Sequence, residues 1–212
     1  MGVATGVFVA ADGPKRSGKT SVLDIVTPML TVAGLQVCHT KEPTAAFDLT
    51  QEESHSGINL ARRLADDRAQ HIESTIRPAR EENDVVITDR YIASSLVFQV
   101  LDGVPFDQAW ELNREFLLPD LNIFVTANAK SSLRRRQERN AKNRTTRLER
   151  ATQTDKEASL YKTAKTFLAA KGVHVADIPN DDGEHRGKDG ERRAETATAI
   201  ADLIKKACNQ FS

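Results

Sequence analysis

The stretch Gly13-Pro14-Lys15-Arg16-Ser17-Gly18-Lys19-Thr20 has the spacing G-x-x-x-x-G-K-[ST] and decides the fold of this chain. An apolar run over residues 6–11 precedes it, and a helical pattern over 18–33 follows it. Glycines at these positions let backbone amides surround a polyphosphate, the lysine reaches its terminal phosphates, and the threonine hydroxyl binds Mg²⁺. The helix N-terminus adds partial positive charge. We therefore expect a triphosphate site formed by Gly13, Lys15, Ser17, Gly18, Lys19, Thr20 and Ser21.

Four more short apolar runs alternate with helical patterns after this loop. Each run is too short for a globular helix and is rich in β-branched residues, so each predicts a strand. The predicted strands cover 6–11, 35–39, 84–88, 121–125 and 172–176, and the helices lie near 18–33, 54–82, 92–101, 106–117, 129–139, 153–170 and 190–209. Strands separated by helices predict a five-stranded, mostly parallel sheet covered on both faces. A chain of 212 residues is long enough for one such α/β domain over residues 1–212.

The composition argues against several classes of partner. Lys and Arg balance Asp and Glu at 30 each, so the formal net charge is zero. Nothing in that balance favours nucleic acid or an anionic membrane as a partner. The N-terminal residues show neither a charged leader nor a long apolar span, and Cys38 and Cys208 are interpreted as reduced thiols. We expect a cytoplasmic protein that acts on small molecules.

Asp89 and Arg90 directly follow the predicted strand 84–88. Ligands of parallel sheets bind at the carboxyl ends of the strands, where P-loop enzymes place a carboxylate linked to Mg²⁺. An arginine beside that carboxylate can grip a phosphate through two hydrogen bonds. An ordinary Asp-Arg surface turn is the alternative. On the functional interpretation, Thr20 and Asp89 hold the metal, and Arg90 holds an acceptor phosphate.

A basic stretch covers residues 130–150, where nine Lys and Arg residues accompany only two Glu residues. Arginines on a closing lid would neutralise the charge of a transferring phosphoryl group and exclude water. A solvated helical face is the alternative, and a nucleic-acid patch is disfavoured because aromatic residues are not interleaved. We predict a short basic lid at about 139–150 that contributes Arg139, Arg144 or Arg147.

Four further motifs follow one another along the chain. They are Lys41-Glu42-Pro43, Asp67-Arg68-Ala69-Gln70-His71, Asp89-Arg90-Tyr91-Ile92-Ala93-Ser94-Ser95 with Phe98-Gln99, and Thr146-Arg147-Leu148-Glu149. Together with the phosphate-binding loop, they resemble the thymidylate kinase family over nearly the whole chain. The resemblance implies a three-layer P-loop kinase fold with a short lid, and usually a homodimer. It also implies transfer of the γ-phosphoryl group of ATP, with Mg²⁺, to dTMP or a related pyrimidine nucleotide.

The resemblance also implies roles for individual residues. On the donor side, Lys19, Arg16 and Arg144 would act on the transferring group, with Asp89 near Mg²⁺. The acceptor would be bound by Lys41, Glu42, Leu64, Arg68, Arg90, Ser94, Ser95 and Phe98. Among these, Arg68 and the two serines would read the pyrimidine ring, and Phe98 would screen the sugar 2′ position.

Three residues depart from the family pattern, and all three face the acceptor. Lys15 replaces an Asp that approaches the substrate sugar, and a lysine offers only hydrogen-bond donors. Leu64 replaces a Phe that stacks on the base, and Lys41 replaces an Arg, so that a bidentate fork becomes a point charge. One interpretation is ordinary divergence within the family. The other is an altered acceptor pocket, in which Lys15 would suit a nucleotide with additional negative charge, or with an oxygen acceptor, near its 3′ side.

Two other functions stay open on the sequence. A deoxynucleoside kinase would need a carboxylate that deprotonates a sugar hydroxyl, and Glu42 could take that role. A nucleotide-binding pseudo-kinase without turnover is supported only by Lys15.

Overall fold

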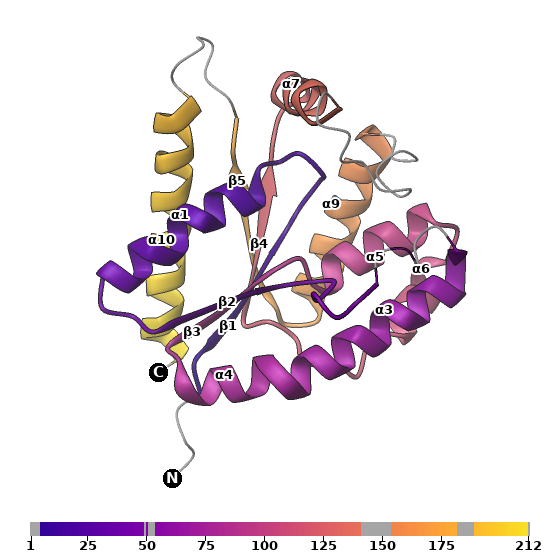
Figure 1. Cartoon of the computed structure of the whole chain (residues 1–212), viewed down its shortest axis with the longest axis horizontal. Helices are drawn as coiled ribbons and strands as arrows, with labels where there is room; N and C mark the ends of the chain where they lie inside the picture. The colour runs from indigo at the N-terminus through magenta and orange to yellow at the C-terminus, as the bar shows by residue number, and fades with distance from the viewer. Residues whose placement is uncertain (1–4, 49, 51–53, 141–153, 182–188, 212) are drawn as a thin grey trace.

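The computed structural model describes residues 5–48, 50, 54–140, 154–181 and 189–211. Its strands are β1 (Val7–Asp12), β2 (Val37–Lys41), β3 (Val85–Asp89), β4 (Leu121–Thr126) and β5 (His174–Pro179). They form one sheet in the order β2-β3-β1-β4-β5, and every neighbouring pair is parallel. The predicted five-stranded parallel sheet is therefore confirmed (Figure 1).

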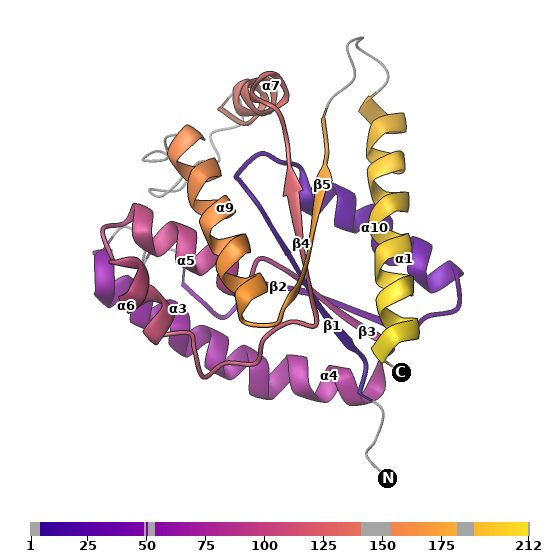
Figure 2. The ribbon, with the colours of Figure 1, turned by 180° about the vertical axis from the view of Figure 1, so that it is seen from behind.

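Helices cover both faces of this sheet. They are α1 (Lys19–Val32), α3 (Gly57–His71), the π-helix η1 (Ile72–Ile76), α4 (Arg77–Glu82), α5 (Ile92–Leu101), α6 (Phe106–Glu111), α7 (Ala129–Asn140), α9 (Thr154–Ala170) and α10 (Asp189–Phe211). Figure 1 and the reverse view in Figure 2 show α1 and α10 on one side of the sheet and α3, α5 and α9 on the other. The layers follow the three-layer α/β arrangement that the sequence predicts.

Side chains that alternate between the two faces of the sheet produce two separate hydrophobic cores. In β1, Val7, Val9 and Ala11 pack toward α1 and α10, whereas Phe8 and Ala10 pack toward α3, α5 and α9. Successive side chains of a strand point to opposite faces, and a sheet buried on both faces therefore needs apolar residues at every position. This explains why the strand sequences read as continuous apolar runs.

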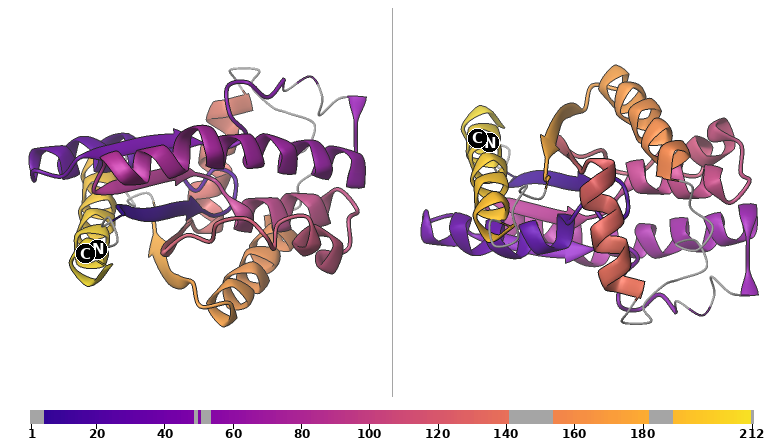
Figure 3. Two further views of the ribbon diagram at one scale, coloured as in Figure 1. Left: turned by 90° about the horizontal axis from the view of Figure 1, so that it is seen from below. Right: turned by 90° about the horizontal axis from the view of Figure 1, so that it is seen from above.

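The helix predicted over 54–82 is interrupted by the π-helix η1. Figure 3 shows α3, η1 and α4 as one long path across the molecule. Pro78 lies just after η1, and the Arg77 N–H donates to the carbonyl of Ile72. Proline has no N–H, and its ring would clash with the carbonyl four residues earlier in an α-helix. The wider turn avoids that clash.

Two other boundaries differ from the prediction for physical reasons. The helix predicted over 106–117 ends at Glu111, where the buried Asn113 side chain donates to the Ala109 carbonyl at 2.7 Å. The last strand begins two residues later than predicted, because Gly172 takes a φ of 89° and ends α9. Within the residues that the structure describes, no helix is long and apolar enough to cross a membrane.

Gly13 combines a positive φ with a close approach to a neighbouring strand. It has a φ of 138°, and a Cβ built there would lie 2.1 Å from the Val125 carbonyl oxygen in β4. Gly34 also has a positive φ, of 91°, but a Cβ there would meet nothing within 4 Å. The two positions thus share an unusual backbone and differ in the space around it.

We expect Gly34→Ala to lower the free energy of unfolding by about 1–2 kcal/mol, the usual cost of a left-handed non-glycine residue. Gly13→Ala should cost roughly 3 kcal/mol or more, because steric overlap adds to the backbone strain. Urea denaturation of both variants measures the difference. Equal losses in the two proteins would contradict the close contact between the loop and β4.

Candidate active site

The phosphate-binding loop joins β1 to α1 in the middle of the sheet. Gly13, Arg16 and Gly18 have φ values of 138°, 70° and 84°, so the chain turns sharply three times within six residues. The turns close the loop around the side chain of Lys19, whose ammonium donates to the carbonyls of Gly13 (2.8 Å) and Pro14 (3.2 Å). The predicted strand, loop and helix are confirmed.

Lys19 has an unusual acid–base character. Burial is the main cause that lowers the pKa of Lys19 to about 7, and the nearby guanidinium of Arg90 lowers it further. The carboxylates of Asp89, Asp12 and Glu157 oppose this shift. An approaching phosphate adds negative charge and would favour the protonated lysine.

Thr20 and Asp89 meet at the end of β3, as predicted. The Thr20 hydroxyl donates to one Asp89 carboxylate oxygen at 2.5 Å. The other oxygen, Oδ1, is buried and has no hydrogen-bond partner among the described residues. A carboxylate oxygen with spare acceptor capacity beside a hydroxyl fits a Mg²⁺ ion, which takes oxygen ligands and few protein groups.

Arg135 and Asn180 support the loop from outside. The Arg135 guanidinium donates to the carbonyls of Arg16 (3.0 Å), Ser17 (2.8 Å) and Asn180 (2.8 Å). The Asn180 amide also donates to the Ser17 carbonyl at 2.6 Å. These contacts fasten the loop to α7 and to the end of β5.

A cavity of about 200 Å³ lies beside the loop, at the carboxyl ends of β2 and β3. Leu60, Ala61 and Leu64 of α3 give it an apolar side. The polar residues that line it include Lys15, Glu42, Arg68, Arg90, Ser94, Ser95 and Gln99. Shape and composition suit a small ligand that carries both an apolar ring and negative charge.

Gln99 is the polar wall residue with the most unused hydrogen-bonding capacity. Its side chain is buried, and neither the amide oxygen nor the amide nitrogen has a hydrogen-bond partner in the described part of the chain. Unpaired buried amides are costly, and each therefore calls for an explanation. A ligand edge that offers one donor and one acceptor would satisfy both atoms.

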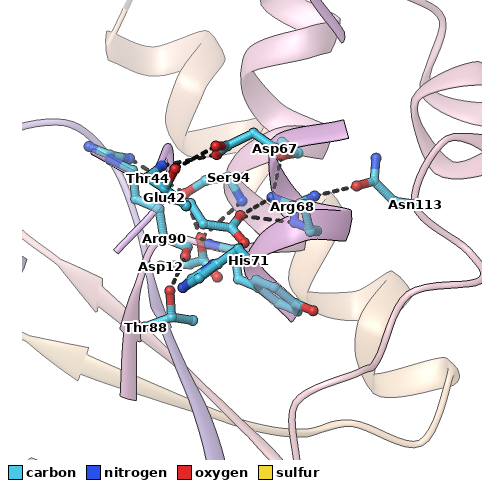
Figure 4. Close-up of polar contacts among 12 residues, drawn as sticks. Asp12, Glu42, Thr44, Asp67, Arg68, His71, Thr88, Arg90, Ser94 and Asn113 are labelled. Carbon is cyan, nitrogen blue, oxygen red and sulfur yellow. Dashed lines mark hydrogen bonds and ion pairs between the residues drawn. The ribbon is translucent and has the colours of Figure 1, made fainter. Parts of the chain in front are cut away.

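A buried ionic network joins β2 to α3 (Figure 4). The Arg68 guanidinium donates to Glu42 through Nε at 2.9 Å and through Nη2, to Asn113 through Nη1, and to Ser95 through Nη2 at 2.8 Å. His71 lies on the other side of Glu42, with its Nδ1 3.0 Å from the carboxylate. Burial disfavours the charged form of Arg68, but Glu42, followed by Tyr91 and Asp12, more than offsets this and raises the pKa of Arg68.

Asp12 links the end of β1 to the start of α5. Its Oδ1 atom accepts hydrogen bonds from the Tyr91 N–H (3.1 Å), the Ser94 N–H (3.0 Å) and the Ser94 hydroxyl (2.5 Å). Asn122 donates to Oδ2 at 3.1 Å. A carboxylate at these amides caps the helix in the same way as a local N-cap residue. The wall of the cavity is therefore fixed to the strand that carries the loop.

Phe98 has two cations over its ring. The Lys15 ammonium lies 4.5 Å and the Arg90 guanidinium 5.1 Å from the ring centroid. Both residues line the cavity, so its mouth toward the phosphate-binding loop is positively charged. This arrangement favours an anionic group at the boundary between loop and cavity.

Comparisons with known proteins agree with this geometry. A family model described as Thymidylate kinase matches residues 11–178. The chain is 33% identical over 143 residues to the thymidylate kinase of Leuconostoc mesenteroides subsp. mesenteroides, an alignment covering 61% of this chain and 67% of that protein. It is 34% identical over 145 residues to the probable thymidylate kinase of Thermococcus gammatolerans, covering 61% and 70%. The chain belongs to the thymidylate kinase family.

Thymidylate kinase membership makes this chain a nucleoside monophosphate kinase, that is, a phosphotransferase. Within that frame, the structure brings together most of the predicted acceptor residues. The cavity wall includes Glu42, Leu64, Arg68, Arg90, Ser94, Ser95 and Phe98. It also includes Lys15, which the sequence places in the phosphate-binding loop and facing the acceptor. Lys41 is exposed and lies outside the group of described residues that line the cavity.

On the donor side, the structure places Ser17, Lys19 and Thr20 in the loop and at the start of α1. Ser17 and Lys19 are buried, whereas Thr20 and Ser21 are exposed. The predicted lid extends beyond what the structure describes: Arg144 and Arg147 lie outside the described residues, as does the rest of 141–153. Arg139 belongs to α7.

Four functional candidates were missed by sequence reasoning. Gln99 was visible as the end of a motif but was given no role. Arg135 is one of three consecutive arginines, and the sequence does not show which of them faces the loop. Asn113 and Glu157 lie in ordinary helical patterns, and no local signal separates them from surface residues.

The pKa of Lys19 leads to a prediction about nucleotide binding. At pH values well above 7, the Lys19 side chain of the nucleotide-free protein is largely neutral. A bound triphosphate favours its charged form, so nucleotide binding should take up a proton. We expect uptake of close to one proton at about pH 8.5, and affinity that falls by up to about tenfold per pH unit above 7. Titration calorimetry with MgATP in two buffers of different ionisation enthalpy measures this uptake.

Lys19→Arg is the matched control, because arginine stays charged throughout this pH range. Its binding should show no comparable uptake. Equal proton uptake by both proteins would assign the effect to another group.

Proposed function

We propose that this chain transfers the γ-phosphoryl group of ATP to the 5′-phosphate of dTMP or of a related or modified pyrimidine nucleotide. The observation that supports this most is the shared boundary between the phosphate-binding loop and the cavity. Lys15 belongs to the loop and also lines the cavity, and Arg90 lies beside both. A donor phosphate in the loop and an acceptor phosphate at the cavity mouth would therefore be neighbours.

On the donor side, Lys19 would bind the terminal phosphates of ATP, and Thr20 with Asp89 would hold Mg²⁺. The unpaired Oδ1 atom of Asp89 supports this metal assignment. Bound Mg²⁺ would neutralise the charge that develops on the phosphates. Arg16 and the lid arginine Arg144 would act on the transferring group if the lid closes as the sequence predicts.

On the acceptor side, Arg90 would bind the 5′-phosphate. Burial disfavours its charge, but Tyr161, Asp89, Asp12 and Glu157 outweigh this and raise its pKa, so the guanidinium stays cationic. A phosphate oxygen is already a nucleophile and needs little help from a general base. Positioning and charge neutralisation would therefore supply most of the rate enhancement.

The cavity wall supports a pyrimidine as the base. Leu60, Ala61 and Leu64 form an apolar side for the ring, and the Gln99 amide can meet an edge with one donor and one acceptor. Arg68 lines the cavity and uses four of its five N–H groups on protein partners, so that one hydrogen of Nη1 could serve a ligand. A donor at that place favours a pyrimidine with a 4-keto oxygen over one with a 4-amino group.

The contacts of Glu42 disfavour a deoxynucleoside kinase. That reaction needs a carboxylate free to accept a proton from a sugar hydroxyl. Both carboxylate oxygens of Glu42 are engaged, one by Arg68 and the other by His71. Glu42 is thus better explained as the anchor of Arg68.

We further propose a cytoplasmic homodimer formed through helices of the first half of the chain, as the family resemblance implies. Light scattering after size-exclusion chromatography tests the dimer. A single species of 23.4 kDa, the mass of one chain, would contradict it.

An acceptor screen with ATP, read as ADP formation, tests the proposed activity. We expect dTMP and dUMP, or a modified 4-keto nucleotide, to be phosphorylated with a higher kcat/KM than dCMP, and nucleosides to be poor acceptors. If no nucleoside monophosphate is phosphorylated, the proposal is wrong.

Gln99→Leu tests the base contact within the same screen. Loss of two hydrogen bonds to the base should reduce kcat/KM for the preferred nucleotide by about 10- to 100-fold. Stability should stay equal or rise, because an unpaired buried amide is removed. Gln108→Leu, at an exposed position on α6, is the control and should change neither property. A parallel loss of activity and stability in Gln99→Leu would indicate a packing role instead.

A further inference from the structure

Glu157 is a buried carboxylate to which the proposed reaction gives no contact with either nucleotide. It lies near the start of α9 and is 1% exposed. Its Oε1 atom accepts a hydrogen bond from the backbone N–H of Lys15 at 2.8 Å, across 142 positions of sequence. A contact of this kind fixes one end of the phosphate-binding loop to the helix that follows the predicted lid.

A buried anion needs compensation, because removing a carboxylate from water is costly. Three features supply it here. The first turn of α9 offers the positive end of the helix dipole, and the Lys15 amide donates directly. The third feature is the positive charge of nearby Lys19 and Arg90, whose charged forms Glu157 favours. The carboxylate therefore belongs electrostatically to the transfer site.

The hydrogen bond also determines where the Lys15 side chain can reach. With its backbone held by α9, Lys15 places its ammonium 4.5 Å from the centroid of the Phe98 ring, in the wall of the cavity. Arg90 approaches the same ring. If the backbone at Lys15 were released, the loop could turn this ammonium away from the cavity without any change in Phe98 or Arg90.

We propose that Glu157 is a positioning residue for the acceptor nucleotide: it holds the backbone of Lys15 so that the Lys15 ammonium faces the negative charge of the acceptor. The inference rests on the proposed function, because it names the residue pair that favours a phosphate-bearing acceptor at that site. Glu157 touches neither substrate in this account, and its hydrogen bond acts on the acceptor through Lys15.

The test compares steady-state kinetics of the full chain and of its Glu157→Ala, Glu157→Gln, Lys15→Ala and double Lys15→Ala/Glu157→Ala variants. Acceptor and ATP are varied separately, with the preferred nucleotide from the acceptor screen. Glu157→Ala should raise the acceptor KM by about tenfold, the scale of a lost charge-assisted hydrogen bond, and change the ATP KM by less than about twofold. Glu157→Gln should have an acceptor KM close to that of the unaltered chain, because the glutamine amide oxygen can still accept a hydrogen bond from the Lys15 N–H.

The double variant separates positioning from general structural damage. With Lys15→Ala there is no ammonium left to position, so adding Glu157→Ala should leave the acceptor KM unchanged. A purely structural role would lower the melting temperature and raise KM equally in both backgrounds. Asp155→Ala, which removes an exposed acid from the same helical turn, is the matched control and should alter neither KM.

Three results would overturn the inference: a full effect of Glu157→Ala in the Lys15→Ala background, no rescue by glutamine, or an equal rise in both KM values. A wild-type chain that phosphorylates no nucleotide would overturn the proposed function, and this inference with it. A working wild-type enzyme with any of the three results would overturn the inference alone.

Discussion

Burial of cations at the carboxyl edge of the sheet is the constraint on which the rest of this structure depends. Lys15, Lys19 and Arg68 are all less than a tenth exposed, and Arg90 is only partly exposed beside them. A phosphate site needs such groups, but each loses hydration when it is buried. Four buried carboxylates compensate for them: Asp12 and Asp89 at the ends of β1 and β3, Glu42 just after β2, and Glu157 in α9. The parallel sheet brings the first three together because the ends of its strands meet at one edge, and α9 adds the fourth.

These carboxylates have different tasks, and their contacts distinguish them. Asp12 accepts from backbone amides and a hydroxyl, so it organises α5. Glu42 is enclosed by Arg68 and His71, so it orients a side chain of the acceptor wall. Asp89 keeps one oxygen without a protein partner in the described structure, so it is the carboxylate best suited to a metal. Carboxylates thus serve as helix cap, anchor and candidate metal ligand, according to what surrounds them.

The sequence predicted the sheet and the phosphate-binding loop well because both are encoded locally. Apolar runs with β-branched residues mark the strands, and the spacing of Gly13, Gly18 and Lys19 marks the loop. The sequence predicted element ends and supporting residues less well where a contact between distant parts of the chain determines them. The turn that ends α6 depends on Asn113, whose other amide atom accepts from Arg68 in α3. Arg135 and Glu157 act on the loop from more than a hundred positions away, and nothing in their own segments distinguishes them.

The contact between Glu157 and Lys15 also bears on how the protein is made. Synthesis proceeds from the N-terminus, so the phosphate-binding loop leaves the ribosome long before α9 exists. Until α9 docks, the loop lacks one of the contacts that set its shape. Contacts so distant in sequence form late and slowly, because a long segment of chain must first be closed. A nascent chain that carries the complete loop motif would therefore still lack a finished nucleotide site until α9 had docked.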